Sequence, residues 1–222
     1  MPRNISAANQ AALEARVLVA RDFLWIVARN RSTGVPVPDG MWSDVGNISA
    51  SVIDPDTGQT VTRNWYGAGT LVAIDDIPLV SNLSAQTVNI RLSQIHDHVQ
   101  QLVREYDCRQ ARVEIYRGLF NPDTRKMVAP AECRFVGFVD KIDIRTPSEN
   151  EDGAVTMTCA SHTQEMFRAN TETRSHETQI LRATNDNFYR DAATTTSWKI
   201  FWGSKQGSVP TQKKRKKFLG IF

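Results

Sequence analysis

Hydrophobic and polar residues alternate along much of this chain, as they do in strands that bury one face and expose the other. The clearest case is QTVNIRLSQ at 86–94, where Val88, Ile90 and Leu92 are separated by polar residues. Other runs rich in β-branched and aromatic residues predict further strands. These runs are FLWIVAR at 23–29, ISASVID at 48–54, VTRNWYGAGTLVAID at 61–75, ARVEIYRGLF at 111–120, FVGFVDKIDI at 135–144 and VTMTC at 155–159.

Regular alternation also assigns faces to the last two of these strands. It places Val155, Met157 and Cys159 together, so that the Cys159 thiol points into the core. The residues expected to share one face of the preceding strand are Val136, Phe138, Ile142 and Ile144. Earlier in the chain, Pro36, Pro38 and Gly40 are expected to stop the strand soon after the run at 23–29.

Helical patterns are fewer. Residues from Ala7 to about Ala20 are rich in Ala, Leu, Glu and Arg, which favours an N-terminal helix. The run at 95–106 spaces four apolar residues at helical intervals. A cap and turn signal at 185–187 predicts a short polar helix near the C-terminal end. The four apolar residues are Ile95, Val99, Leu102 and Val103.

Two stretches resemble each other and suggest an internal repeat. Gly69–Leu92 and Gly137–Cys159 each join a strand, a loop, a second strand and a following helix-compatible segment. We therefore expect a mainly β (α+β) fold of antiparallel barrel or sandwich units with a few short helices, and the repeat leaves open whether the units are duplicated. The expected divisions are 1–35 (helix and first strand), 36–107 (first β-unit), 108–203 (second β-unit) and 204–222 (extended basic tail).

The C-terminal end carries the candidate interaction residues. SWKIFWG at 197–203 alternates Trp198, Ile200 and Trp202 and predicts an aromatic strand that anchors in the core or on a partner subunit. A polar linker, a basic run and the apolar FLGIF follow, which is typical of a segment that docks on another chain. The candidate residues are Trp198, Phe201, Trp202, Lys213, Lys214, Arg215, Lys216, Lys217, Phe218, Leu219, Ile221 and Phe222.

The charge of the chain is concentrated in this tail. The formal net charge is +3, but five basic residues lie together at 213–217, and the remaining 22 Lys and Arg residues face 24 Asp and Glu residues. A nucleic-acid-binding domain would carry its basic surface on the fold itself, so nucleic acid is not expected as a partner.

The sequence predicts neither a membrane span nor a secretion signal. The apolar runs are shorter than the roughly 20 residues of a membrane span, and the N-terminal residues lack the layout of a secretion signal.

Few residues suggest chemistry. Cys159, Ala160, Ser161 and His162 resemble part of a nucleophilic site, but a cysteine on the apolar face of a strand is more often inert. Cys108 and Cys133 are distant in sequence, which argues against a disulfide framework and leaves open whether the three thiols converge on a metal. His96 and His98 are expected on a solvated helix face. Phosphate-loop, nucleophile-elbow and zincin motifs are absent, so we predict no enzyme activity and no cofactor.

The order and spacing of several motifs resemble tailed-bacteriophage tail proteins of the distal-tail and tail-tip hub (baseplate) group. The resemblance covers roughly 40–190, and no single motif is chemically specific. The motifs are MWSDVGNI, WYGAGTLVAIDDI, VNIRLSQI, VEIYRGLFNPDT, CRFVGFVDKIDI and VTMTCASHTQEM.

This resemblance implies a structural virion protein, made in the host cytoplasm, that forms a trimeric or hexameric ring between tail tube and tip. The implied partners are other copies of the chain and the tail-tube, tip or fibre, and tape-measure proteins. Some hub relatives hold an iron–sulfur cluster through grouped C-terminal cysteines, and this chain lacks such a group. Two alternatives stay open: a nucleic-acid-binding module acting through the basic tail, and a tail-tip hydrolase using Cys159 and His162.

Overall fold

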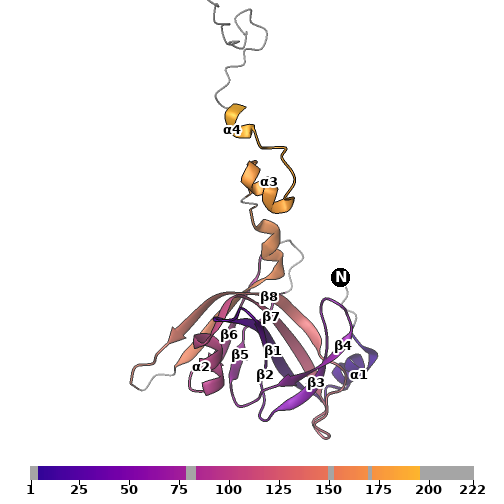
Figure 1. Ribbon diagram of the computed structural model, residues 1–222. Coiled ribbons are helices and arrows are strands. Elements are labelled where there is room, and N and C mark those ends of the chain that lie inside the picture. The colour runs from indigo at the N-terminus through magenta and orange to yellow at the C-terminus, as the bar shows by residue number, and fades with distance from the viewer. Residues whose placement is uncertain (1–4, 79–83, 150–152, 170–171, 196–222) are drawn as a thin grey trace, which may run out of the picture. The chain divides into compact units, whose positions relative to one another are not determined.

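The structure of the protein is a computed structural model that describes residues 5–78, 84–149, 153–169 and 172–195 (Figure 1). The chain divides into two compact units, Met1–Arg168 and Ala169–Phe222. The elements of the first unit are α1 (Ala7–Ala15), β1 (Val19–Asn30), β2 (Pro36–Trp42), β3 (Ile48–Ile53), β4 (Thr60–Trp65), β5 (Leu71–Ile74), β6 (Thr87–Ser93), α2 (Asp97–Arg104), β7 (Tyr106–Phe120), β8 (Glu132–Arg145), β9 (Ala154–Ser161) and the 3₁₀ helix η1 (His162–Phe167).

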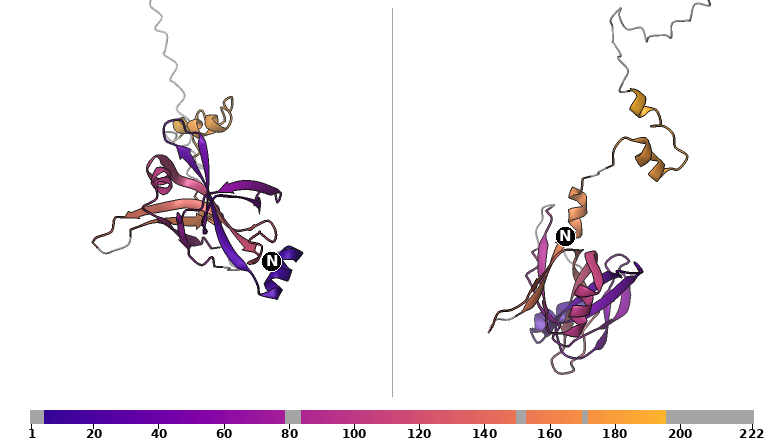
Figure 2. Two further views of the ribbon diagram at one scale, coloured as in Figure 1. Left: turned by 90° about the horizontal axis from the view of Figure 1, so that it is seen from below. Right: turned by 60° about the vertical axis from the view of Figure 1, so that its left-hand side comes forward.

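Seven strands of the first unit form one antiparallel sheet, in the order β2-β1-β7-β8-β9-β6-β5. The central strands are long, and β7 alone has 15 residues. Long strands coil because each carries a right-handed twist. The sheet accordingly curls into a half-barrel, which Figures 1 and 2 show from three sides. The predicted mainly β, antiparallel fold with few helices is confirmed.

The β3–β4 hairpin closes one half of this sheet into a small barrel. Trp42 donates its backbone N–H to Tyr66, and Tyr66 donates to Gly40, so the end of β4 is attached to β2. Ala131, directly before β8, exchanges two backbone hydrogen bonds with β3. The strands β1, β2, β4, β3, β8 and β7 therefore follow one another around a closed ring.

The first unit has two hydrophobic cores. The barrel core is aromatic: Phe23, Trp65 and Tyr116 are at most 1% exposed, and the ring centroids of Phe23 and Trp65 lie 4.9 Å apart. The sheet core lies under α2, which packs against β7 and buries Val99 and Leu102. The predicted inward residues of β6 and β9 all belong to the sheet core: Val88, Ile90, Leu92, Val155, Met157 and Cys159.

A β-bulge in β8 changes which residues of that strand are buried. In the ladder with β9, Val139 pairs with Cys159, whereas Lys141 pairs with Thr158, so Asp140 is an extra residue. One extra residue moves every later side chain to the opposite face of the sheet. The core-facing positions therefore have odd numbers before Asp140 and even numbers after it.

This bulge explains why only part of the face predicted for β8 is correct. Ile142 packs against the sheet core as predicted, and Ile144 lies on the same side but is 43% exposed. The assignment of Val136 and Phe138 to that face is wrong, because Phe135 is the buried residue in this half of the strand.

Pro36 and Pro38 do not end the strand region as predicted; they lie within β2. Asn30 donates its backbone N–H to the carbonyl oxygen of Val35. From that pair onward, every second residue of β2 points its backbone N–H and C=O groups toward β1. Both prolines fall on the alternate positions, which face away from β1, so the ladder loses no hydrogen bond.

Two helix boundaries also differ from the prediction. Helix α1 ends at Ala15, five residues before the predicted end, because Arg16 adopts a left-handed conformation with φ of 58°. Helix α2 begins at Asp97, so Ile95 precedes it and is 91% exposed instead of facing the core. Among the described residues, no helix has the length and apolar character that crossing a membrane requires.

The two similar stretches, Gly69–Leu92 and Gly137–Cys159, are both antiparallel hairpins, β5–β6 and β8–β9. They share one sheet because β6 pairs with β9, so they are not separate barrels or sandwich halves. Their matching glycines have different roles. Gly69 has φ of +71° and open space around it, whereas a Cβ on Gly137 would lie 2.2 Å from the carbonyl oxygen of Ala160.

In the second unit, the described residues 172–195 form two short helices, α3 (His176–Arg182) and α4 (Ala192–Thr195). Ser175 caps α3 by accepting the backbone N–H of Thr178. Asp186, within the predicted turn at 185–187, accepts the backbone N–H of Phe188 at 2.9 Å. The large apolar side chains of Leu181 and Phe188 are more than 80% exposed.

Candidate interaction site

The Cys159–His162 run does not bring a nucleophile and a base together. Cys159 lies in β9 with none of its surface exposed, packed in the sheet core. His162 begins η1, is exposed, and its ring centroid lies 5.5 Å from that of Phe138. Burial raises the pKa of Cys159 to about 12, so the thiol keeps its proton at neutral pH. The hydrolase alternative therefore has no activated thiol at this position.

The other two thiols are also held in the protonated form. Cys108 donates to the backbone oxygen of Leu102 at 3.2 Å in the sheet core, and Cys133 packs against the barrel core. Burial raises the pKa of each to about 11. Within the described ranges, His, Cys, Asp and Glu side chains form no group of three or more that could hold a metal ion, so the three cysteines do not converge on one.

We expect thiol labelling of the native protein at pH 8 to leave Cys159 unmodified. A pKa of about 12 leaves a thiolate in about one molecule in ten thousand at that pH, and the thiolate is the reactive form. The half-buried Cys133 should react first, and all three should react rapidly in denaturant. Intact-mass measurement with peptide mapping checks this, and rapid native labelling of Cys159 would contradict it.

His96 and His98 belong to a half-buried polar cluster, not to the solvated helix face that was predicted. His96 precedes α2, and its Nδ1 caps the helix by accepting the backbone N–H of His98 at 3.2 Å. His98 Nε2 lies 2.8 Å from Asp39 Oδ1, and the Tyr66 hydroxyl lies 3.2 Å from His96 Nε2. The Tyr66 and His98 rings stack at 4.6 Å. These contacts attach α2 to the junction of β2 and β4.

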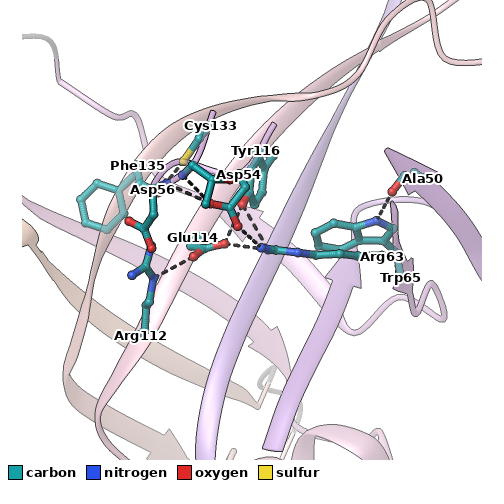
Figure 3. Close-up of polar contacts among 11 residues, drawn as sticks. Ala50, Asp54, Asp56, Arg63, Trp65, Arg112, Glu114, Tyr116, Cys133 and Phe135 are labelled. Carbon is teal, nitrogen blue, oxygen red and sulfur yellow. Dashed lines mark hydrogen bonds and ion pairs between the residues drawn. The ribbon is translucent and has the colours of Figure 1, made fainter. Parts of the chain in front are cut away.

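A buried charge network joins the β3–β4 hairpin to β7 (Figure 3). Glu114, only 4% exposed, accepts hydrogen bonds at 2.6 Å from Arg63 Nη1 and at 2.6 Å from the Tyr116 hydroxyl. Its second oxygen accepts a hydrogen bond from Arg112 Nε at 2.7 Å. Arg63 also donates to Asp54, at the start of the hairpin turn, at 3.2 Å. Two guanidinium groups thus compensate one buried carboxylate.

The network positions the hairpin and has no spare group for acid–base work. The Arg63 guanidinium lies 4.6 Å from the ring centroid of Trp25, a cation–π contact with β1. Arg112 Nη2 lies 2.7 Å from Asp56 Oδ2 in the hairpin turn. Burial, with the hydrogen bond to Glu114, raises the pKa of Tyr116 well above its usual value, so the hydroxyl remains a donor.

On one side of the junction between β2 and β4 the barrel wall is open, because the two strands are not hydrogen-bonded to each other there. We call this opening the β2–β4 slot. The two strands are bridged at Met41 and Tyr66. Beyond that bridge lies a hollow of about 700 Å³. Trp25 and Trp65 are among the residues that line it, and so is Pro38 of β2.

The backbone of β4 turns polar groups into this slot. Tyr66 hydrogen-bonds to β2, away from β3, and alternate residues of a strand point their N–H and C=O groups to the same side. Thr60, Thr62 and Asn64 therefore direct their backbone groups away from β3, toward the β2 side. Thr62 and Asn64 line the hollow, and the Asn64 carbonyl oxygen already lies close to Gly40 of β2. The residues opposite them on β3 show the same pattern. Ser51, which lies opposite Thr62, accepts a backbone hydrogen bond from Ala131 on the side away from β4. No described residue of β2 pairs with Thr60 or Thr62.

None of the interaction residues predicted from the sequence can be placed. Their role remains a prediction, because they lie outside the described residues: Trp198, Phe201, Trp202, Lys213, Lys214, Arg215, Lys216, Lys217, Phe218, Leu219, Ile221 and Phe222.

Sequence reasoning missed the charge network and the slot. Arg63 and Glu114 each occur singly within strands, where a charged residue ordinarily marks a wet face. The available signal was FLWIVAR at 23–29, whose apolar residues are continuous rather than alternating. A continuous run indicates a strand that is buried on both faces, and Phe23 and Leu24 are indeed buried in different cores.

Comparisons with known proteins give a limited result. No protein-family profile and no curated protein sequence matches the chain. A solved chain from the virion of a native gene transfer agent particle is similar in structure, with a TM-score of 0.45 and 18% sequence identity. The match covers 77% of this chain and 50% of that one, so this chain spans about half the length of its structural neighbour. A likeness at this level assigns neither family nor function.

Proposed function

We propose that the chain is a structural subunit of a tailed-phage virion, located at the tail tip as part of the distal-tail or hub ring. In this role it joins the tail tube to the tip or baseplate and performs no catalysis. Its partners are further copies of itself and neighbouring tail proteins.

One observation carries this proposal. The motifs that resemble distal-tail and hub proteins fall, in order, on successive strands of the first unit. MWSDVGNI runs from β2 into β3, WYGAGTLVAIDDI covers the end of β4 and β5, and the remaining motifs lie on β6, β7, β8 and β9. The resemblance is therefore a resemblance of the strands that build the barrel and the sheet.

Two further observations support a role in assembly. The thiols are protonated in the cores, so the described residues offer no activated cysteine nucleophile. Large apolar side chains are exposed instead, including Val45, Ile95 and Phe167, each at least 60% exposed. Exposed apolar side chains of this size suit surfaces that are covered on assembly.

Native mass measurement of the purified protein tests the proposal. We expect a trimer or a hexamer, since closed rings of identical subunits have defined stoichiometry. Cys159→Ala should leave that assembly unchanged, because the thiol packs in the sheet core and performs no reaction. A protein that stays monomeric at every concentration, and is absent from purified virions, would rule the proposal out.

A further inference from the structure

We propose that the β2–β4 slot receives the segment 197–203, SWKIFWG, of a second copy of this chain, as an additional strand paired with β4. The inference rests on the self-assembly proposed above and names the surface and the segment that would carry it. In such strand addition, main-chain hydrogen bonds provide affinity and alternate side chains provide specificity.

The other open edges in the described part of the chain are poor acceptors. On the edge of β2 that faces away from β1 and forms the other side of the slot, Pro36 and Pro38 occupy positions where a partner would need N–H donors, and proline has none. Strand β5 has four residues, and a register shift between Leu71 and Ala73 interrupts its pairing with β6. A partner strand would find few regularly spaced backbone groups on either edge.

Strand β4 offers the acceptor that β2 and β5 lack. Thr60 and Thr62 turn their backbone N–H and C=O groups away from β3 and have exposed side chains, whereas the Asn64 carbonyl oxygen already lies close to Gly40 of β2. Native proteins protect exposed strand edges with proline or lysine. The run from Thr60 to Asn64 contains neither residue, and its one charged side chain, Arg63, points into the barrel and is paired there with Glu114. The backbone groups of Thr60 and Thr62 are therefore blocked neither by a proline nor by an unpaired charge.

The segment 197–203 has the side chains that the slot would select. A strand added to β4 would direct alternate side chains toward the barrel, where the half-buried Trp25 lies 5.5 Å from Trp65, centroid to centroid. Trp198, Ile200 and Trp202 alternate in the segment, so one register directs all three toward this aromatic surface. The same register directs Lys199 away from the barrel.

A second copy is the occupant that this arrangement favours. The segment needs an existing edge, because its polar flanks predict no second strand with which it could form its own sheet. Each copy has one slot and one segment, so donation from each copy to the next is a heterologous contact. Contacts of this kind form a ring when the rotation between neighbouring copies closes, and a closed ring leaves no slot unfilled.

Cross-linking between two differently tagged full-length variants tests the inference. One variant carries Thr62→Cys and the other Lys199→Cys, since both side chains would lie on the outer side of the added strand pair. A short bismaleimide should join the two chains with a yield at least tenfold above that of Ala73→Cys, which puts the thiol on β5. Adding Trp198→Ser and Trp202→Ser to the Lys199→Cys chain should reduce the yield to the Ala73→Cys level.

The results separate this inference from the proposed function. Oligomers in native mass measurement, with equal yields from Thr62→Cys and Ala73→Cys, would overturn strand donation and leave self-assembly intact. A link that forms only within single chains carrying both Thr62→Cys and Lys199→Cys would overturn the choice of a second copy. A monomer at every concentration would overturn both proposals.

Discussion

Replacing Arg63 with methionine is expected to lower the free energy of unfolding by about 3–5 kcal/mol, the usual cost of removing one partner from a buried ion pair. Arg63 and Glu114 side chains are 12% and 5% exposed, and Arg63 is the cation that reaches Glu114 from the hairpin. Without it, Glu114 stays buried with Arg112 as its remaining cation, and Asp56–Arg112 is the ion pair that still joins the hairpin turn to β7. Urea unfolding followed by circular dichroism measures the change.

Two variants make this expectation specific. Lys141→Met removes a cation from an ion pair whose side chains are 65% and 53% exposed, and it should change stability by no more than about 1 kcal/mol. The double variant Arg63→Met, Glu114→Leu removes both charges and should recover much of the loss, because no buried charge then lacks its partner. Equal losses from Arg63→Met and Lys141→Met would show that the network contributes little.

Replacing Trp65 with alanine is expected to cost about 3–5 kcal/mol, as for other buried aromatic residues. Its ring is 1% exposed and contacts Phe23, Trp25 and Tyr116 at centroid distances of 4.9, 5.5 and 6.1 Å. Its indole N–H also donates to the backbone oxygen of Ala50 at 3.3 Å. The variant would leave a cavity at the centre of the barrel and remove the hydrogen bond to Ala50.

Thermal unfolding and near-ultraviolet circular dichroism measure this effect. Val61, on the same strand, is 38% exposed, so Val61→Ala serves as the matched control and should stay within about 0.5 kcal/mol of the parent. Trp65→Phe should fall between the two, because it keeps most of the ring and loses the hydrogen bond. A Trp65→Ala protein as stable as Val61→Ala would mean that the aromatic core is not closely packed.

Sequence alternation was a reliable guide where a strand has one buried face. Val88, Ile90 and Leu92 on β6, and Val155 and Met157 on β9, lie where the pattern predicted. In these strands the partners are regularly paired, so the parity of a residue decides its side of the sheet. The mainly β class could be predicted for the same reason.

The pattern failed where the ladder is irregular or where both faces are buried. An extra residue such as Asp140 carries no signal in its own identity, yet it reverses the parity of the rest of β8. The barrel adds a different difficulty. Its closure depends on a few backbone hydrogen bonds between distant segments, such as Trp42 to Tyr66, and backbone groups are the same in every sequence. Glu114 is buried only because that closure occurs.

The arrangement of two cores around shared strands has a consequence for how the first unit unfolds. Successive residues of β1, Phe23 and Leu24, belong to different cores, and so do Ile115 and Tyr116 of β7. Withdrawing either strand would expose apolar surface in both cores at once. Barrel and sheet are therefore coupled into a single cooperative folding unit, in which neither part can open far while the other stays intact.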